Sequence, residues 1–357
     1  MKNTLICTVG TSLKSHLEKA GYVDNAITAA HWLKSQDPTE RQCGAEVNSN
    51  TSILQHGFLD DKYALHLLVS DTDAGRYIGK VLNLYYKDQF KVVEVYPIEG
   101  LHDQDFKSFK NRGLRNLVKR VAEIIKQTQN RGYEAVINAT GGFKAQISFV
   151  GLIGQTLGTP VYYMFEKFAE VIEMPPMPVS FDFSLWLEHF ELLEKLSNEF
   201  LSENDPLIQK ADPKLYPLWD IEDGEVIFSA MGDLFHEGFK HRFNREGRNL
   251  LPPDSGKNPS EKKIRYEDNN AGKHRGLANY LKKIIEVPYV TGISTFYYNK
   301  DLPEKNKFRS PSGETDRVEG CYSDGKATTK FWVLLTSNSV NEVRAAVVDL
   351  TERLKRF

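Results

Sequence analysis

The stretch that decides the fold runs from residue 134 to residue 144 and reads EAVINATGGFK. Its first five residues have the length and apolar content of a buried strand, and a helical pattern follows over residues 143–157. A strand that passes through a glycine turn into a helix is typical of a parallel α/β sheet. This stretch therefore predicts one βα unit, with Thr140, Gly141 and Gly142 in the turn.

Working outward from this unit, similar patterns recur through the first half of the chain. Apolar strand-like runs occupy residues 3–9, 64–69, 91–97 and 160–165, and residues 113–128 carry apolar side chains at helical spacing. Strands that alternate with helices predict a Rossmann-like, doubly wound and mostly parallel sheet over about residues 1–175.

A second turn of related composition follows the first predicted strand, where residues 8–13 read TVGTSL. Ligands of doubly wound sheets bind outside the carboxyl ends of the strands. Glycine lets the backbone approach a phosphate, hydroxyl groups and helix-start N–H groups donate to it, and Lys144 adds a positive charge. There is no GxxxxGK[ST] motif, so this is not a Walker site. The alternative is that the glycines only form tight turns, but two such turns favour a phosphate-containing ligand.

The two turns together resemble the signature turns of CARF domains, the CRISPR-associated Rossmann-like receptors. Residues 70–76 (SDTDAGR) and 98–101 (IEGL) stand where such domains often have similar runs. The resemblance implies a homodimer with a symmetric pocket, and cyclic oligoadenylate, with four adenylates the commonest expectation, as the activator; it implies no other cofactor. The implied ligand-binding residues are Gly10, Thr11, Ser12, Asn138, Thr140, Gly141, Gly142, Phe143 and Lys144.

Composition sets the wider frame. A chain of 357 residues predicts two or three domains. Its three cysteines, Cys7, Cys43 and Cys321, form no metal spacing, and no apolar run is long enough for a membrane helix, so a cytoplasmic location is expected. Residues 236–357 hold 23 Lys and Arg against 16 Asp and Glu, whereas the remainder holds 23 against 32. The basic C-terminal part is expected either to meet a polyanion such as RNA or simply to be solvated.

A proline cluster at residues 173–179 (EMPPMPV) predicts a domain boundary. The predicted domains are a sensor over 1–178, a small helical or winged-helix connector over 179–238, which includes a helix at 184–202, and an α+β effector over 239–357. Residues 244–274 are predicted to form a loop. Helices are predicted at 274–286 and 339–356, with strands at 290–298, 316–322 and 328–336. If residues 224–229 supply the first strand, the effector order is β-α-α-β-β-β-α and its boundary moves to about residue 222.

CARF-like receptors usually control an attached effector domain, and three types of effector can be compared with this pattern. No Arg precedes a His at the spacing of HEPN ribonucleases. A literal PD-(D/E)xK match at Pro253-Asp254, Glu261 and Lys263 lies in a polar, turn-rich segment and is interpreted as chance. The predicted order and basic bias resemble the RelE-like ribonucleases, which cleave messenger RNA on the ribosome without a metal. That resemblance implies catalytic candidates among Lys305, Lys307, Arg309, Arg317, Tyr322 and Lys330, although the usual Gly-Tyr-Arg strand run of the family is absent.

The leading hypothesis is a cyclic-oligoadenylate-activated ribonuclease of type III CRISPR defence. Two alternatives stay open at this point. A ring nuclease would cleave the cyclic ligand in the sensor pocket, with Thr11, Ser12 and Lys144 positioning a ribose 2′-OH. A non-enzymatic regulator would bind DNA through the connector, although the acidic residues of that segment argue against it.

Overall fold

The computed structural model describes residues 1–22, 25–175, 182–267 and 274–354. It forms two compact units. The N-terminal unit comprises Met1–Phe181 and Leu196–His241, and the C-terminal unit comprises Asp182–Lys195 and Arg242–Phe357. Most of the predicted connector thus groups with the N-terminal unit. The predicted boundary at residue 178 falls in 176–181, outside the described residues.

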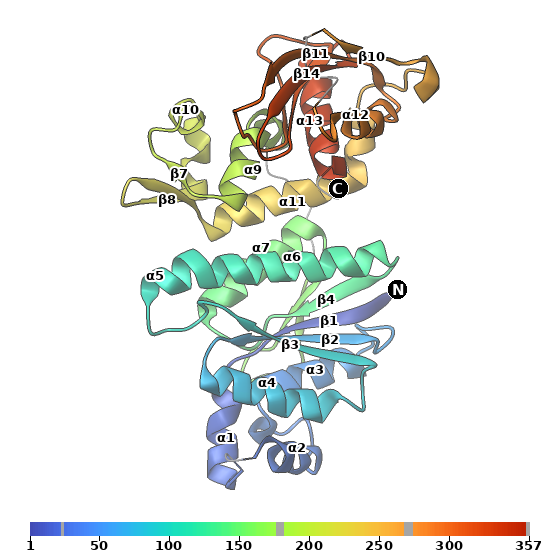
Figure 1. The fold of residues 1–357 in the computed structure, drawn as a ribbon. Helices are drawn as coiled ribbons and strands as arrows, with labels where there is room; N and C mark the ends of the chain where they lie inside the picture. The colour runs from blue at the N-terminus through green and yellow to red at the C-terminus, as the bar shows by residue number, and fades with distance from the viewer. Residues whose placement is uncertain (23–24, 176–181, 268–273, 355–357) are drawn as a thin grey trace. The chain divides into compact units, whose positions relative to one another are not determined.

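A six-stranded sheet forms the centre of the N-terminal unit, in the order β3-β2-β1-β4-β5-β6 (Figure 1). All neighbours are parallel except β5 and β6. The strands are β1 (Lys2–Thr8), β2 (Ala64–Ser70), β3 (Val92–Ile98), β4 (Glu134–Asn138), β5 (Val161–Tyr163) and β6 (Ile172–Met174). The predicted doubly wound, mostly parallel sheet is therefore present.

Helices cover both faces of this sheet (Figure 1), and β1 contributes to both cores. Leu5 and Cys7 pack on one side and Ile6 on the other, which explains why the strand is apolar throughout. One face carries α1 (Ser12–Ala20), α2 (Ala26–Lys34), α3 (Ala45–Gln55) and α4 (Asp73–Tyr86), with the 3-10 turn η1 (Arg41–Cys43) before α3. The other carries α6 (Leu114–Asn130) and α7 (Lys144–Leu157), and α5 (Phe106–Ser108) and the π-helical turn η2 (Phe109–Gly113) precede α6.

A small three-stranded sheet, β7-β9-β8, follows in the chain. It consists of β7 (Leu201–Ser202), β8 (Trp219–Glu222) and β9 (Glu225–Phe228), with α10 (Pro206–Gln209) and η3 (Pro213–Leu218) between the first two. Asp223 and Gly224 both have positive φ, which allows the tight β8–β9 hairpin. This hairpin corrects the conditional prediction that residues 224–229 open the effector sheet, because β9 pairs with β7 and β8 instead.

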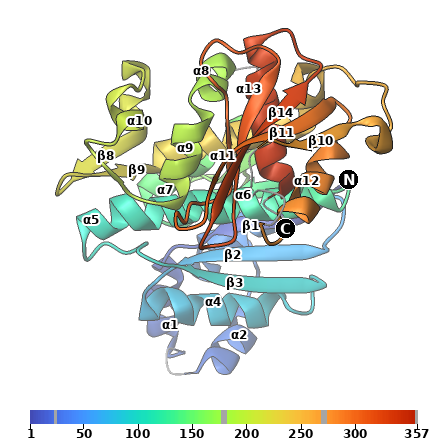
Figure 2. The ribbon, with the colours of Figure 1, turned by 45° about the horizontal axis from the view of Figure 1, so that its top comes forward.

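The C-terminal unit contains a five-stranded sheet in the order β10-β11-β14-β13-β12, and Figure 2 labels β10, β11 and β14. The strands are β10 (Lys263–Tyr266), β11 (Val290–Asn299), β12 (Lys307–Arg309), β13 (Arg317–Ser323) and β14 (Thr328–Leu335). β10 runs parallel to β11, and the other neighbours are antiparallel. Buried Phe331 and Phe308 lie on the face that packs against Tyr280 of α12 (Leu277–Ile285). The closing helix α13 (Val340–Leu354) also packs on this sheet, against β12 and β13.

The remaining helices differ in part from the sequence prediction. The predicted helix at 184–202 is divided into α8 (Phe183–Glu188) and α9 (Phe190–Asn198). α11 (Ala230–Glu246) and η4 (Gly247–Leu250) extend into the predicted loop at 244–274, which also holds η5 (Pro259–Glu261) and β10. Among the described residues the order is β10, α12, β11, β12, β13, β14 and α13, which does not reproduce the predicted β-α-α-β-β-β-α. Residues 268–273 of that segment lie outside the described residues.

Candidate functional site

The two glycine turns meet at the carboxyl ends of β1 and β4. These strands are neighbours in the sheet, and the chain leaves β1 toward β2 on one side and reaches β4 on the other. This is the topological switch point, where doubly wound sheets bind ligands. The approach is close, because a Cβ atom on Gly10 would lie 2.9 Å from the Gly142 nitrogen.

Glycine is required at both positions of the second turn. A Cβ on Gly141 would lie 2.1 Å from Glu46 Oε1 and 2.6 Å from the Thr8 carbonyl oxygen. Gly142 has φ of +103°, a conformation that side chains disfavour, and its Cβ would meet Gln146 Oε1. That same oxygen accepts a 2.6 Å hydrogen bond from the Phe143 N–H. The backbone of this turn is therefore fixed by packing on both sides.

A buried polar network lies beneath the turns and holds the second one. Asn138 Nδ2 donates to Ser49 Oγ and to Asn50 Oδ1, each at 2.7 Å. Its Oδ1 accepts from the backbone N–H of Thr140 at 3.1 Å and from the Thr140 hydroxyl at 2.6 Å. The Thr8 hydroxyl donates to the Gly141 carbonyl oxygen at 2.6 Å. Each bond satisfies a polar group that burial would otherwise leave unpaired.

Glu46 joins the network from the first turn of α3. Its Oε1 accepts a 2.6 Å hydrogen bond from the Gly10 N–H, whereas its buried Oε2 has no hydrogen-bond partner among the described residues. Burial raises the pKa of the Glu46 carboxyl, and the hydrogen bond from Gly10 opposes this effect. Glu46, Ser49 and Asn50 occupy positions i, i+3 and i+4, so one face of α3 contacts both turns.

The nine predicted ligand-binding residues thus fall into three groups. Thr11, Ser12 and Lys144 are exposed and available to a ligand. Asn138 is fully buried and, with Thr140, holds the turn through hydrogen bonds. The remaining members form the turn backbone, and Phe143 packs edge-on against Phe109 at 5.3 Å between ring centroids. Sequence reasoning missed Glu46, Ser49 and Asn50, whose burial depends on tertiary contacts.

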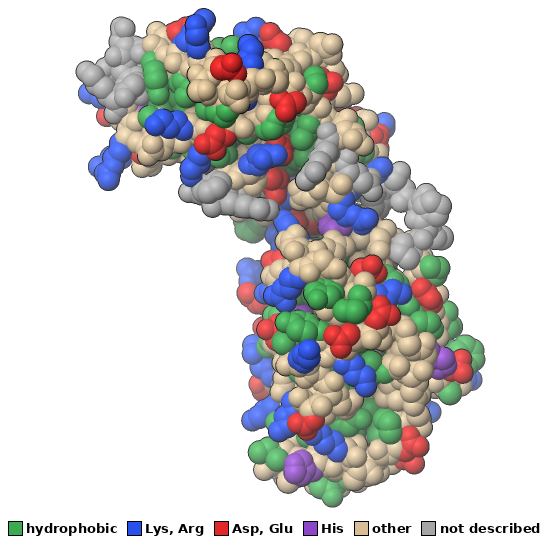
Figure 3. All heavy atoms as spheres, turned by 90° about the vertical axis from the view of Figure 1, so that its right-hand side faces the viewer, with side chains coloured by type: hydrophobic (Ala, Val, Ile, Leu, Met, Phe, Trp, Pro, Cys, Tyr) green, Lys and Arg blue, Asp and Glu red, His purple; other side chains and the backbone are tan. Residues whose placement is uncertain are grey.

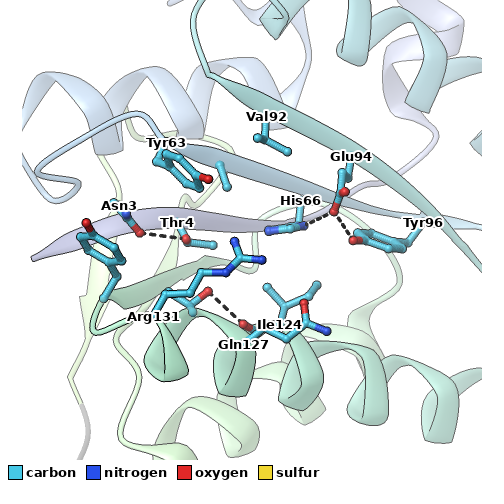
Figure 4. A pocket seen from close by; sticks show the side chains of 13 residues that line it. Asn3, Thr4, Tyr63, His66, Val92, Glu94, Tyr96, Ile124, Gln127 and Arg131 are labelled. Atoms are coloured by element: carbon cyan, nitrogen blue, oxygen red, sulfur yellow. Dashed lines mark hydrogen bonds and ion pairs between the residues drawn. The ribbon is translucent and has the colours of Figure 1, made fainter.

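A separate cavity of about 310 Å³ lies near the amino ends of β1, β2 and β3 (Figure 4). His66, Glu94 and Tyr96 point toward one another there, with 3.2 Å between His66 Nδ1 and Glu94 Oε2. Burial lowers the pKa of His66, which favours its neutral form. None of the predicted ligand-binding residues lines this cavity.

In the C-terminal unit, four of the six predicted catalytic residues share one face of the sheet. Lys307 is paired with Cys321 and Arg309 with Glu319, while Cys321 and Glu319 are paired with Lys330 and Trp332 of β14. Residues directly opposite in antiparallel strands point to the same side, as do residues two apart in a strand. We call this side, with Lys307, Arg309, Arg317, Lys330 and Trp332, the outer face.

Carboxylates accompany the cations of the outer face. Glu304 lies 3.0 Å from Lys307 Nζ and 3.4 Å from Lys330 Nζ, and Arg309 pairs with Glu319 at 2.6 Å. The bond to Lys307 and the charge of both lysines lower the pKa of Glu304 against the effect of burial.

Aromatic rings lie among these charges. Trp332 stacks on Phe296 at 4.6 Å and carries the Arg317 guanidinium 5.8 Å from its ring centre. Lys330 Nζ lies 5.4 Å from the centre of the Tyr297 ring. The face therefore combines cations with exposed aromatic surface, the combination that binds single-stranded nucleic acid.

The other two predicted catalytic residues lie elsewhere. Tyr322 is opposite Thr329 on the inner side, where its hydroxyl donates to the Arg275 carbonyl oxygen at 3.0 Å and its ring contacts His274. Lys305 is exposed in the segment between β11 and β12. His274 is itself buried and contacts Thr329 Oγ1 at 2.8 Å, an arrangement that suits packing rather than chemistry.

The described residues also bear on other site types. They contain no group of three or more His, Cys, Asp and Glu that could hold a metal ion. Of the literal PD-(D/E)xK match, Glu261 lies in η5 and Lys263 begins the exposed strand β10. No helix in the described part of the chain has the length and apolar character to cross a membrane. On the face shown in Figure 3, basic and acidic side chains are interspersed.

Comparisons with known proteins place part of the chain in context. Residues 41–177, less than half of the chain, match the model of a family described as CRISPR-associated protein (Cas_APE2256). The match begins just before Glu46 and includes the second glycine turn. A search of curated proteins finds no match.

Two solved structures resemble the chain weakly. Protein VC1899 from Vibrio cholerae is 8% identical, with 94% of this chain and 77% of that chain covered and a TM-score of 0.24. Can2 from Sulfobacillus thermosulfidooxidans, solved in complex with cyclic tetra-adenylate, is 12% identical, with 71% and 70% covered and a TM-score of 0.25. Superposition at this level assigns neither fold nor function. The firmer result is the match of residues 41–177 to the model of a CRISPR-associated family.

Proposed function

We propose that the chain is a cyclic-oligoadenylate-activated ribonuclease of type III CRISPR defence. The observation that carries the proposal is the meeting of two glycine turns at the switch point of a parallel sheet, within a unit that matches a CRISPR-associated family. The resemblance of these turns to CARF domains supplies the ligand class. The N-terminal unit is the receptor, and the C-terminal unit is the effector.

The receptor site has the chemistry that phosphates need. The first N–H groups of α1 and α7 have no acceptor within their own helices, and each helix begins at one of the turns. Thr11 and Ser12 add exposed hydroxyl groups, and Lys144 adds an exposed cation. Two copies of this site across a two-fold axis suit a ring of repeated phosphates, so the active form is a homodimer that binds cyclic tetra-adenylate.

Calorimetric titration of the full chain with cyclic tetra-adenylate tests the receptor. One ring should bind per two chains, and Lys144→Gln should weaken binding by about tenfold because it removes one charge-assisted contact. Lys19→Gln, at the far end of α1, is the matched control and should bind as the unaltered chain does. Absence of saturable binding would contradict the receptor assignment.

The outer face of the C-terminal sheet is the proposed ribonuclease site. RNA cleavage without a metal needs cations that stabilise the crowded phosphate. Lys307, Lys330, Arg309 and Arg317 supply the cations on one face, and Trp332 with Phe296 supplies a surface for base stacking. The expected substrate is messenger RNA on the ribosome. Glu304 and Glu319 form ion pairs with these cations in the structure, so RNA phosphates must replace the two carboxylates as partners of the cations.

A further inference from the structure

The buried carboxyl group of Glu46 lies directly under the place where the proposed ligand binds. Its Oε1 accepts from the Gly10 N–H, and it is the atom that a Cβ on Gly141 would strike. It therefore touches both turns at once. The side chain is fully enclosed, with 1% of its surface exposed.

The surroundings of Glu46 offer little to stabilise a negative charge. Oε2 has no hydrogen-bond partner, and Glu46 makes no ion pair among the described residues. Its closest titratable neighbours are the Cys7 thiol on β1 and the Tyr86 phenol on α4, and burial raises the pKa of both, so they are neutral. Other titratable groups on the elements around it include Lys14, His16, Glu18 and Lys19 on α1, Arg41 and Cys43 on η1, Tyr85 on α4, and Lys144 on α7.

Those outer charges are engaged or solvated. Lys14 pairs with Glu18 at 3.8 Å, Arg41 pairs with Glu166 at 4.0 Å, and Lys144 is exposed at the start of α7. Burial raises the pKa of Cys43 to about 11, so this thiol is neutral as well. A charged Glu46 thus depends on backbone hydrogen bonds alone, from the Gly10 N–H and from its own N–H.

A phosphate at the turns would change this balance. It brings negative charge next to a carboxyl group in a region of low dielectric, where like charges repel strongly. Protonation of Glu46 removes the repulsion and leaves Oε1 able to accept from Gly10. By linkage, a ligand that favours the protonated form must bind more tightly as the proton concentration rises.

We propose that Glu46 is a proton-linked positioning residue, which takes up a proton when a phosphate-containing ligand binds at the two turns. The proposal rests on the proposed receptor function. It assigns Glu46 no contact with the ligand. It predicts that the affinity for cyclic tetra-adenylate rises as pH falls, by up to about tenfold per pH unit, wherever Glu46 is ionised in the free protein and protonated in the complex.

The test is calorimetric titration of the full chain with cyclic tetra-adenylate in two buffers of different ionisation enthalpy at the same pH, repeated at several pH values. The difference in heat between the buffers counts the protons taken up. Glu46→Gln keeps the shape and the hydrogen bond from Gly10, but it carries no charge. We expect net proton uptake and pH-dependent affinity in the unaltered chain, and we expect Glu46→Gln to lose both while binding at least as tightly near neutral pH.

The matched control is Glu18→Gln, which removes an exposed carboxylate from α1. It should retain the proton uptake. Binding with equal proton uptake by the unaltered chain and Glu46→Gln would overturn the inference and leave the receptor function standing. Absence of binding by the unaltered chain at every pH would overturn both. If Glu46→Gln fails to fold, His16→Gln takes its place: proton uptake that persists in His16→Gln supports the inference, and its loss there, or its absence in the unaltered chain, contradicts it.

Discussion

The turn region of the N-terminal unit and the outer face of the C-terminal sheet differ in the burial and charge of their polar groups. In the turns, Asn138, Ser49 and Asn50 are buried and neutral, and they bond to one another and to the backbone. On the outer face, Lys307, Lys330 and Glu304 are charged and partly exposed, and they pair with one another. The first arrangement fixes a shape, whereas the second can exchange partners at small cost.

The largest expected effect tests the shape of the turns. Gly141→Ala would place a methyl group within 3 Å of Glu46, Thr8 and Gly10, so we expect a loss of about 3 kcal/mol in the free energy of unfolding, together with loss of ligand binding. Denaturant unfolding and calorimetry would measure the two effects.

Gly151→Ala on α7 is the control for that substitution, because its Cβ would meet nothing within 4 Å. Alanine in a helix interior should stabilise the chain by up to about 1 kcal/mol. Equal behaviour of the two variants would show that the turns are not tightly packed.

The next effect concerns chemistry rather than shape. The double variant Lys307→Gln and Lys330→Gln removes two cations from the outer face, and we expect RNA cleavage to slow on the order of 100-fold. Binding of cyclic tetra-adenylate should not change. Lys300→Gln, an exposed lysine beyond β11 that pairs with Asp301, is the control and should cleave normally. Full activity in the double variant would remove the outer face from the mechanism.

A smaller expected effect is the pH dependence of the unfolding free energy that the buried Glu46 carboxyl causes. Because burial raises the pKa of Glu46 above its ordinary value of 4.5, the unfolded chain releases this proton first as pH rises. The folded state is therefore penalised progressively above pH 4.5, up to the folded pKa. Glu46→Gln lacks this penalty, so its stability relative to the unaltered chain should increase as the pH rises above 4.5 and level off above the folded pKa. A flat difference in unfolding free energy over this range would argue against a strained carboxylate.

The smallest expected effect lies in the ion pairs of the outer face. A double-mutant cycle with Glu304→Gln and Lys330→Gln should give a coupling free energy below about 1 kcal/mol in the absence of RNA, because both groups remain partly solvated. A much larger coupling free energy would mean that the Glu304–Lys330 ion pair is strong and that RNA could not easily replace Glu304.

The same contrast explains what the sequence could and could not predict. The predicted strands at 134–138 and 64–69 follow from short apolar runs, and the structure has them as β4 and β2. α3 was not predicted because its buried face carries Glu46, Ser49 and Asn50, which do not follow an apolar period. A polar face that is buried only through tertiary contacts has no signature in hydrophobic patterning.

The C-terminal unit shows a similar limit. β10 lies at the sheet edge with exposed Lys263, Arg265 and Tyr266, so its sequence has the polarity of a loop. β9 pairs with β8 and not with the C-terminal sheet because Asp223 and Gly224 turn the chain back in a tight hairpin. Tyr322 lies on the opposite side of the sheet from the proposed catalytic cations. This follows from the strand register, which the sequence pattern does not give.

The most direct test of the account is RNA cleavage by the purified full chain in EDTA, with and without cyclic tetra-adenylate, and with ribosomes present or absent. The account predicts cleavage that depends on the cyclic ligand, persists in EDTA and is strongest on ribosome-bound messenger RNA. Cleavage that is independent of the ligand or abolished by EDTA, or no cleavage under any of these conditions, would contradict it.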